Sequence, residues 1–454
     1  MHQNKIIITL YQKQISVKKT IFIIQLVILT AGIPVDILAQ QQRFPKPEFQ
    51  TEYQIPETTV QDPRAPLMDY VDLALLIAVM AVSIWFIFKK RSRKGIFWIG
   101  IFSLLYFGFY REGCICAVGA VQNLSLALFN NSYVVPITAL GFFIIPLVVS
   151  LFYGRIFCAS ACPLGIIQDI FIVKPIRIAS WLQTTLGIIP YLYLGFAILF
   201  AATGAGFIIC RYDPFIGFFR LGAEFHMIVL GVFFLATGMF VARPYCRFVC
   251  PYGALLNITS RFSHKHLSIT PENCVNCHLC KDSCPFDAID KPTDEKEQKL
   301  TKKFSGKFLL FAALIPFFMF FGGWAVSGSY KTLSKVHPDV ALVNLIIANP
   351  EVLQDAKNID VQTFLTSGKT MENLVENAAT IQQEFKIGGW WLGGFIGLVI
   401  ALTLLNQMVF RSKDIYEANR GTCFSCARCL DYCPVGKPDH PYHQQEKQNS
   451  GIES

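Results

Sequence analysis

Charged side chains are scarce in this sequence. Asp, Glu, Lys and Arg together make up 16% of its 454 residues, whereas 53% are hydrophobic and 40 are Phe. The mean hydropathy is +0.43. Soluble domains carry about 25% charged residues, so this composition excludes a chain of ordinary soluble globules. It predicts a protein that crosses a membrane several times.

Signals for nucleotide and nucleic-acid binding are also missing. The sequence has no glycine-rich nucleotide fingerprint and no phosphate-binding loop, and the short motifs at 327–329 and 366–370 do not predict one. The net charge of +9 comes from basic residues in short loops beside apolar runs. Basic residues in that position determine membrane topology, so we expect no nucleic-acid partner.

Cysteine, by contrast, is abundant, with 15 residues. Eight of them form two runs of the spacing C-x2-C-x2-C-x3-C-P. These are Cys274, Cys277, Cys280 and Cys284, and then Cys423, Cys426, Cys429 and Cys433. The spacing is typical of bacterial ferredoxins, in which three thiolates hold one [4Fe-4S] cluster and the fourth binds the neighbouring cluster. Two copies predict two clusters.

Crossed ligation assigns one cluster to Cys274, Cys277, Cys280 and Cys433 and the other to Cys423, Cys426, Cys429 and Cys284. The alternative is a pair of four-cysteine zinc sites or disulfides. Zinc sites usually separate their two C-x2-C pairs by a longer loop, so the compact runs favour iron-sulfur clusters. Because a reducing compartment favours thiolate ligation of iron, we expect most of the cysteines, including both runs, to face the cytoplasm.

Seven apolar segments are long enough to cross about 30 Å of hydrocarbon. They are residues 69–88, 95–112, 133–153, 186–205, 226–242, 306–326 and 388–410. Five basic residues between 89 and 94 place the first loop in the cytoplasm by the positive-inside rule, and Arg155, Arg177 and Arg243 agree. By parity, 113–132 and 206–225 are outer loops. Both ferredoxin runs then lie on the inner face.

The predicted fold is an all-α polytopic protein of the bacterial inner membrane, with about seven transmembrane helices and a small cytoplasmic dicluster ferredoxin-like α+β module. Residues 1–39 are typical of a signal peptide or signal anchor, and 40–68 of a periplasmic linker. The remaining parts are a membrane domain (69–265), the first ferredoxin half (266–305), a transmembrane helix (306–326), a periplasmic helical segment (327–387), another transmembrane helix (388–410), and the second ferredoxin half with the tail (411–454).

Residues 95–169 and 188–257 share a tandem pattern of helix, outer-facing cysteine, helix and C-x3-C-P loop, which favours a pseudo-symmetric core. The two inner loops together carry Cys158, Cys162, Cys246 and Cys250. A spacing of four puts each pair on one side of a helical turn, after which proline ends or redirects the chain. We refer to these four thiols as the quartet. They predict a third metal or cluster site, or alternatively structural thiols or a redox-active dithiol.

The outer loops carry Cys114, Cys116 and Cys210. An irregular loop could bring them to one metal ion, and a disulfide from Cys210 to either of the others, or free thiols, are the alternatives. Asp213, Arg211 and a few histidines, such as His226 and His278, are weaker candidates for proton transfer to a quinone. No catalytic constellation stands out.

Through the paired C-x3-C-P loops and the two ferredoxin runs, residues 95–290 and 411–436 resemble the polyferredoxin membrane proteins of the NosR and NapH type. The resemblance implies electron transfer between the quinone pool or a cytoplasmic donor and a periplasmic reductase or electron carrier, as in nitrous oxide or nitrate respiration. It also implies an alternative role as an accessory factor for a periplasmic metalloenzyme. The region before the first span is a short linker, so we expect the flavin-bearing periplasmic domain of NosR to be absent.

Two functions from other classes stay open. One is a redox sensor or maturation factor whose clusters or dithiols report a state instead of carrying electron flux. The other is a membrane scaffold stabilised by zinc, which would lack the visible absorption of iron-sulfur clusters.

Overall fold

The computed structural model describes residues 65–113, 116–130, 133–269, 274–275, 277–293, 312–354, 358–368, 370–408, 413 and 415–435. The predicted signal or anchor, the linker up to residue 64 and the tail from residue 436 lie outside these residues. The described part of the chain is mostly helical and contains two short strands. It agrees with the predicted fold class at this level.

The longer helices are α2 (Pro66–Trp85), α3 (Arg93–Ser103), α4 (Ala117–Phe129), α5 (Ile137–Tyr153), α7 (Pro163–Ile170), α9 (Ile189–Ala202), α12 (Phe225–Gly238), α14 (Pro251–Arg261), α17 (Ile315–Gly328), α19 (Pro338–Ala348), α20 (Ile359–Thr366) and α21 (Met371–Met408). The short helices are α6 (Ile156–Ser160), α8 (Ser180–Leu186), α10 (Ile208–Arg211), α11 (Ile216–Phe219), α13 (Pro244–Phe248), α15 (Leu279–Ser283), α18 (Tyr330–Leu333) and α22 (Arg428–Tyr432). π-Helical turns η1 (Phe86–Lys90) and η2 (Leu104–Tyr110) continue α2 and α3, and 3-10 turns form η3 (Ser334–Val336) and η4 (Pro350–Gln354).

Three helical segments of the described chain are long and apolar enough to cross a membrane: Pro66–Lys90, Ser180–Ala202 and Met371–Gln407. They overlap the predicted spans at 69–88, 186–205 and 388–410. Three of the other predicted spans correspond to the shorter apolar helices α5, α12 and α17, and the span at 95–112 corresponds to α3 with η2. The apolar, helical architecture is that of a membrane protein.

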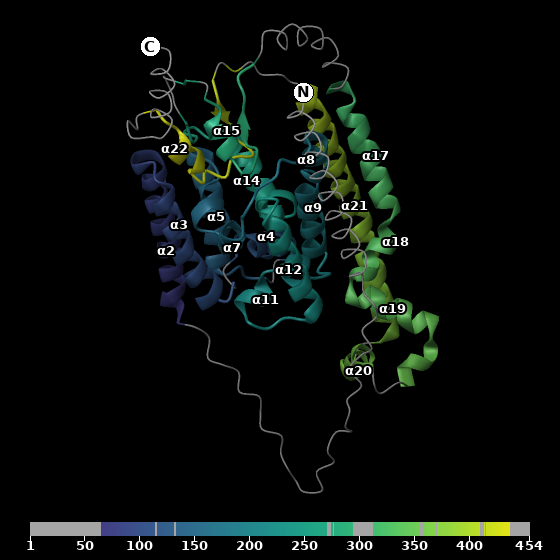
Figure 1. Ribbon diagram of the computed structural model, residues 1–454. Helices are drawn as coiled ribbons and strands as arrows, with labels where there is room; N and C mark the ends of the chain where they lie inside the picture. The colour runs from purple at the N-terminus through teal and green to yellow at the C-terminus, as the bar shows by residue number, and fades with distance from the viewer. Residues whose placement is uncertain are drawn as a thin grey trace, which may run out of the picture. The chain divides into compact units, whose positions relative to one another are not determined.

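The predicted outer loop at 113–132 contains a buried helix. In α4, the residues from Ala117 to Gln122 are all buried, and the helix packs against α5, α9 and α14 (Figure 1). A helix of 13 residues is about 20 Å long, which is too short to cross about 30 Å of hydrocarbon. A hydropathy average over the length of a full membrane span therefore assigns α4 to a loop. Its uncharged residues nevertheless suit the interior of a helical bundle.

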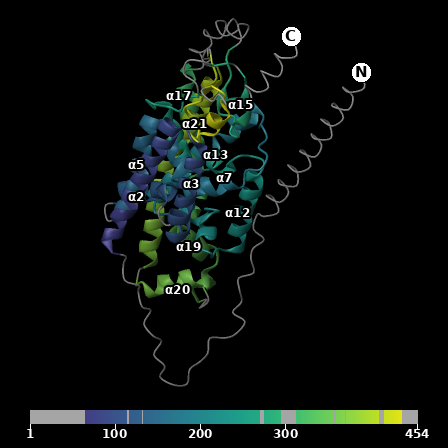
Figure 2. The same cartoon turned by 60° about the vertical axis from the view of Figure 1, so that its left-hand side comes forward.

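The two ferredoxin runs meet in one small module. Strand β1 (Ile289–Asp290) pairs antiparallel with β2 (Glu417–Ala418), with Ile289 opposite Ala418. Helix α15 from the first run packs on α22 from the second. Figures 1 and 2 draw both short helices at the same end of the helical bundle. The module therefore has the predicted mixture of helix and strand.

One continuous hydrophobic core joins the module to the bundle. It runs from Leu76 and Phe107 in the long helices, through the cysteines of the quartet, to Phe286 and Phe424 in the module. A second core lies between α19, α20 and α21, around Val361 and Phe385. The segment from 327 to 387 is helical, as the sequence predicts, but its last part continues into α21 without a break.

Helices α17 and α21 carry the chain between the two ferredoxin runs and pack side by side (Figure 1). Their contact depends on glycine. Gly389, Gly393 and Gly397 recur every fourth residue and so share one face of α21. A methyl group at Gly393 would collide with the backbone of Gly322, whereas one at the neighbouring Gly394 would meet only Met319 O, at 3.7 Å. Small residues let two membrane helices approach this closely.

We expect the Gly393→Ala substitution to lower the free energy of unfolding by about 1–3 kcal/mol, because the added methyl group forces the two backbones apart. The measurement is the unfolding midpoint of the purified protein in detergent. Gly394→Ala is the matched control, and it should be neutral or stabilising by up to about 1 kcal/mol because alanine favours the helix. Equal destabilisation by both changes would contradict this packing.

Candidate functional site

Two small cavities in the module are each lined by four cysteines. The first is lined by Cys274, Cys277, Cys280 and Cys433. The second is lined by Cys284, Cys423, Cys426 and Cys429. Each group takes three cysteines from one run and the fourth from the other, because β1 pairs with β2 and α15 packs on α22. This is the grouping predicted from crossed ligation.

The spacing of these thiols bears on what they can bind. Four thiolates on one zinc ion at about 2.3 Å bring their sulfur atoms within roughly 4 Å of one another. Across the described residues, no three Cys, His, Asp or Glu side chains gather closely enough to hold a single ion. A [4Fe-4S] cluster binds each thiolate at a different iron and so holds the sulfurs further apart. The all-thiolate donor sets around the two cavities fit such clusters.

The quartet is also assembled and buried. Each of its four cysteines is at most 7% exposed. Cys162 lies close enough to interact electrostatically with the other three. The two loops that carry these cysteines come from distant parts of the chain, so the fold, and not local sequence, brings the four thiols together.

Each C-x3-C-P loop breaks between its two cysteines. Cys158 lies within α6, whereas Cys162 precedes α7 in an extended conformation. Pro163 then occupies the first position of α7, where its missing N–H costs nothing. The pair does not share one helical turn, which differs from the expectation, but proline redirects the chain as expected. The second loop repeats this arrangement with α13 and α14.

Gln168, in α7, ties the second loop to the first. Its Nε2 donates a hydrogen bond to Cys246 Sγ at 3.2 Å, and its Oε1 accepts one from the backbone N of Tyr245 at 3.1 Å. The glutamine is fully buried. Burial raises the pKa of the Cys246 thiol to about 12, against the opposing effect of Arg243. The side-chain amide thus fixes Cys246 from two directions.

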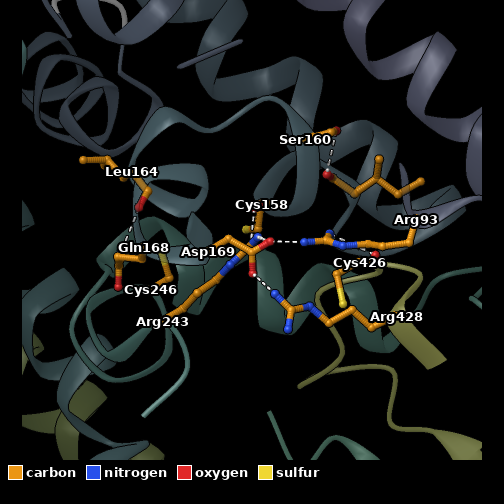
Figure 3. Close-up of polar contacts among 11 residues, drawn as sticks. Arg93, Cys158, Ser160, Leu164, Gln168, Asp169, Arg243, Cys246, Cys426 and Arg428 are labelled. Carbon is orange, nitrogen blue, oxygen red and sulfur yellow. Dashed lines mark hydrogen bonds and ion pairs between the residues drawn. The ribbon is translucent and has the colours of Figure 1, made fainter. Parts of the chain in front are cut away.

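A single carboxylate, Asp169, follows Gln168 and faces three arginines (Figure 3). Arg93 is paired with its Oδ2 atom. Arg243 Nη2 lies 3.4 Å from Oδ2, and Arg428 Nη2 lies 3.3 Å from Oδ1. The Asp169 side chain is 2% exposed and that of Arg243 is fully buried. We call these four residues the Asp169 ion cluster.

The Asp169 ion cluster contacts both the quartet and the cysteine-bearing module. Arg243 Nη1 donates to the backbone O of Cys158, in the quartet, at 2.5 Å. Arg93 Nη1 donates to the backbone O of Cys426, in the module, at 3.1 Å. Arg428 belongs to α22 of the module itself. The cluster is therefore a buried polar contact between the module and the bundle.

Arg243 is held in an unusual position to make these contacts. Its φ of 49° lies in the left-handed region, which costs a non-glycine residue about 1–3 kcal/mol. Its guanidinium carbon lies 5.6 Å from the ring centres of both Phe286 and Phe424. One ring comes from each half of the module, and the two rings are 4.8 Å apart. These cation-π contacts offset the backbone strain.

The ion cluster has a defined dependence on pH. Burial alone would raise the pKa of Asp169, but Arg243, Arg93 and Arg428 outweigh it and lower the pKa below its ordinary value. A lowered pKa in the folded state means that the carboxylate stabilises the fold at neutral pH. That contribution is fully present above about pH 4 and is lost as the pH falls towards the lowered pKa.

Sequence reasoning missed the ion cluster. It assigned Arg155 and Arg243 to membrane topology, yet both are buried. Arg155 Nη1 donates to the backbone O of Gly421 at 3.2 Å, and its guanidinium lies 4.3 Å from the ring centre of Phe424. The sequence does contain one signal for these two arginines: each lies at the same distance before a C-x3-C-P loop.

The outer candidates are partly brought together. Cys114 lies outside the described residues. Cys116 is a half-buried free thiol just before α4, and Cys210 is exposed within α10. Both line one cavity of about 170 Å³, which Asp213 also lines. Asp213 is 2% exposed, and burial raises its pKa to about 6 although backbone hydrogen bonds lower it.

The other proton-transfer candidates lie elsewhere. His226 is exposed, with its Nδ1 3.2 Å from a carboxylate oxygen of Glu224. His278 lies in the module, where its Nδ1 contacts the hydroxyl of Tyr416. Arg211 is exposed above the ring of Tyr212, 5.8 Å away. None of these side chains lines the cavity that holds Asp213.

We expect the Asp169→Asn substitution to lower the free energy of unfolding by about 3–5 kcal/mol, because it leaves desolvated guanidinium groups without their counter-ion. The measurement is thermal unfolding in detergent by circular dichroism, with trypsin cleavage of the module as a second readout. The module should become more sensitive to trypsin because one of its buried polar contacts with the bundle is lost.

Asp282→Asn is the matched control. Asp282 pairs with Arg177 at 2.5 Å, but the two side chains are 63% and 57% exposed, and exposed pairs contribute about 0.2–1 kcal/mol. A similar loss of stability in both variants would show that the Asp169 ion cluster has no special role.

Models of known families match the thiol-bearing parts of the chain. A 4Fe-4S binding domain model matches residues 135–187 and 224–270, which contain both C-x3-C-P loops. A second 4Fe-4S binding domain model matches residues 267–290, which contain the first ferredoxin run. No solved structure matches the chain.

Several curated proteins are similar over parts of the chain. The uncharacterized protein MJ0750 of Methanocaldococcus jannaschii is 28% identical over 207 residues, which is 42% of this chain and 82% of that protein. Regulatory protein NosR of Stutzerimonas stutzeri is 26% identical over 245 residues, 48% of this chain and 33% of NosR. The methylamine utilization ferredoxin-type protein MauN of Paracoccus denitrificans is 31% identical over 158 residues, 31% of this chain and 52% of MauN.

The chain thus spans most of the archaeal relative but only about half of MauN and a third of NosR. Together with the two ferredoxin runs and the paired C-x3-C-P loops, these matches support the resemblance of the chain to polyferredoxin-like iron-sulfur proteins such as NosR.

Proposed function

We propose that this chain carries electrons within the bacterial inner membrane, between the quinone pool or a cytoplasmic donor and a periplasmic reductase or electron carrier, as in nitrous oxide or nitrate respiration. The observation that carries the proposal is the contact between the quartet and the module. The Asp169 ion cluster binds the backbone of Cys158 in the quartet and of Cys426 in the module. A chain that only stored metal would not need this contact.

The module's two cysteine groups would hold two [4Fe-4S] clusters. Bound there, the clusters supply one-electron transfer at potentials that depend on burial and on hydrogen bonds to sulfur. The chain provides both. Cys423 and Cys429 are buried, and the backbone N of Ser425 donates to Cys423 Sγ at 3.4 Å. Such donors reduce the negative charge on sulfur and so favour the reduced state.

The quartet would hold a third iron-sulfur centre. A membrane about 30 Å thick is too wide for one electron hop from a module on its surface, so a path needs a site inside the protein. The quartet shares one hydrophobic core with the module and the long helices. Gln168 gives Cys246 a side-chain hydrogen bond at 3.2 Å, as expected of a residue that orients a ligand.

We place the module in the cytoplasm, residues 327–387 in the periplasm, and all seven predicted segments across the membrane. The basic residues at 89–94 support this orientation. The packing of α17 against α21 supports it as well, because an even number of crossings returns the second ferredoxin run to the face of the first.

A second function, redox sensing or support of a periplasmic metalloenzyme, has one observation in its favour. The relative from Stutzerimonas stutzeri is named a regulatory protein. The two functions differ in flux. An electron carrier must be reoxidised rapidly by a quinone or a partner protein, whereas a sensor need only change state once.

We expect Cys158→Ser and Cys246→Ser to slow the reoxidation of the dithionite-reduced protein by a soluble quinone analogue by about tenfold or more. The reason is that each change removes a thiolate between the module and the membrane interior. The measurement is stopped-flow absorbance of the full chain in nanodiscs under anaerobic conditions. The visible absorption of the module should be retained.

Ser160→Ala is the control for this experiment. Ser160 is buried in α6, two residues from Cys158, and donates to the backbone O of Ile156 at 3.2 Å. It should reoxidise at the wild-type rate. Wild-type rates in both cysteine variants would remove the quartet from the electron path and favour the sensing function.

A further inference from the structure

The loop before α4 repeats the local pattern of the C-x3-C-P loops. The stretch from Cys116 to Gln122 and the stretch from Cys162 to Gln168 share the spacing C-x2-G-x2-Q. In both stretches the cysteine directly precedes a helix, α4 or α7, and the glutamine is fully buried. The outer loop is therefore built like the first loop of the quartet.

The two glutamines also make the same hydrogen bond. Gln168 Oε1 accepts from the backbone N of Tyr245 at 3.1 Å. Gln122 Oε1 accepts from the backbone N of Ile209 at 3.0 Å. Tyr245 and Ile209 each stand immediately before a cysteine that is the third residue of a short helix, α13 or α10. Two loops far apart in the sequence are joined by the same contact in both places.

This equivalence pairs Cys116 with Cys162 and Cys210 with Cys246. The two glutamines differ in the hydrogen bonding of Nε2. Gln168 Nε2 donates to Cys246 Sγ at 3.2 Å, whereas Gln122 Nε2 is buried and has no hydrogen-bond partner within the described chain. A buried amide donor without a partner costs about 1–3 kcal/mol. A ligand in the adjacent cavity would provide an acceptor for it.

Asp213 occupies the place of the last thiol. Asp213-Pro214 follows Cys210 in the sequence much as Cys250-Pro251 follows Cys246, with one residue fewer between the two donors. Its Oδ1 accepts from the backbone N of Phe215 at 2.9 Å, which closes a local turn. Its Oδ2 is buried and unpartnered in the part of the chain that the structure describes.

The three donors share one cavity of about 170 Å³, lined by Cys116, Cys210 and Asp213. Gly119 makes room for it, because a Cβ at this position would lie 3.2 Å from Cys210 Sγ. The buried Tyr245 side chain lies near both the cavity and the quartet. It lies within electrostatic range of both Asp213 and Cys250.

We propose that Cys116, Cys210 and Asp213 bind a further iron-sulfur centre and that Gln122 is a positioning residue for it, as Gln168 is for the quartet. Thiolates select iron-sulfur clusters, and a side chain other than cysteine can take the place of a thiolate, as histidine does in Rieske centres. The inference rests on the proposed electron-transfer function. It places a centre at the cavity lined by Cys116, Cys210 and Asp213.

The test is metal analysis with Mössbauer and electron paramagnetic resonance spectroscopy on the full chain, purified anaerobically in detergent. We expect Cys116→Ser and Asp213→Asn each to lose the iron and the signal of one centre and to keep those of the module. Asp213→Asn retains the Oδ1 atom that closes the turn, so its effect reports on Oδ2. Asp213→Cys, unlike Asp213→Asn, should keep the centre but alter its spectra. Ser125→Ala, buried in α4, should match the wild type.

Gln122 needs a separate readout. Leucine occupies the matching position in the second C-x3-C-P loop, as Leu256. Gln122→Leu should therefore keep the iron of the outer centre but shift its reduction potential, measured by redox titration of its paramagnetic signal. An unchanged potential would overturn the positioning role.

Other outcomes separate this inference from the proposed function. Wild-type iron and spectra in both Cys116→Ser and Asp213→Asn would overturn the outer centre and leave the electron-transfer function intact. Zinc at the outer cavity, with iron elsewhere, would overturn it as well. A preparation with no iron at all would overturn the proposed function together with this inference.

Discussion

The structure depends on the burial of one carboxylate among three guanidinium groups. Moving such charges out of water costs several kcal/mol per ion, and the cost is recovered only when each finds its partners at close range. Asp169 meets that condition only when α3, α7, α13 and α22 are all in place, because Arg93, Arg243 and Arg428 come from different elements. The ion cluster therefore makes the docking of the module and the closing of the bundle one event.

The cysteine groups depend on the same event. Each cavity of the module takes cysteines from both ferredoxin runs, and between the runs the chain passes through α17, α19, α20 and α21. The glycine contacts that let α17 and α21 approach return the second run to the first. Arg243 then holds Phe286 and Phe424, one ring from each half, against the quartet. Ligation by residues so distant in sequence is possible only in the complete fold.

Sequence analysis predicts the cysteine chemistry better than the fold that holds it. The ferredoxin spacing is local, so it identifies the eight module cysteines and their crossed grouping without any structure. The Asp169 ion cluster leaves no such local trace, because Arg93 and Arg428 lie 76 and 259 residues away from Asp169 in the sequence. The pairing of Gln122 with Ile209 cannot be predicted for the same reason, because the two residues are 87 positions apart in the sequence.

Helix boundaries show a second limit. Helix α4 is too short for a span and too apolar for a loop, so a hydropathy window misassigns it. Helix α21 changes from polar to apolar along its 38 residues and is about 57 Å long. Its two halves are predicted as separate elements because only the second half has the composition of the membrane interior. The composition of a helix changes with its surroundings, whereas the helical backbone can continue unbroken from one environment into the next.

The account's central claim is that cysteines on both sides of the Asp169 ion cluster carry iron. The most direct test is the iron and acid-labile sulfide content of the anaerobically purified chain, measured before and after Cys280→Ser and Cys429→Ser together remove the clusters of the module. The account predicts more iron and sulfide than two [4Fe-4S] clusters contain, with the excess retained in the double variant. Iron and sulfide for two clusters alone, and none in the double variant, would contradict it.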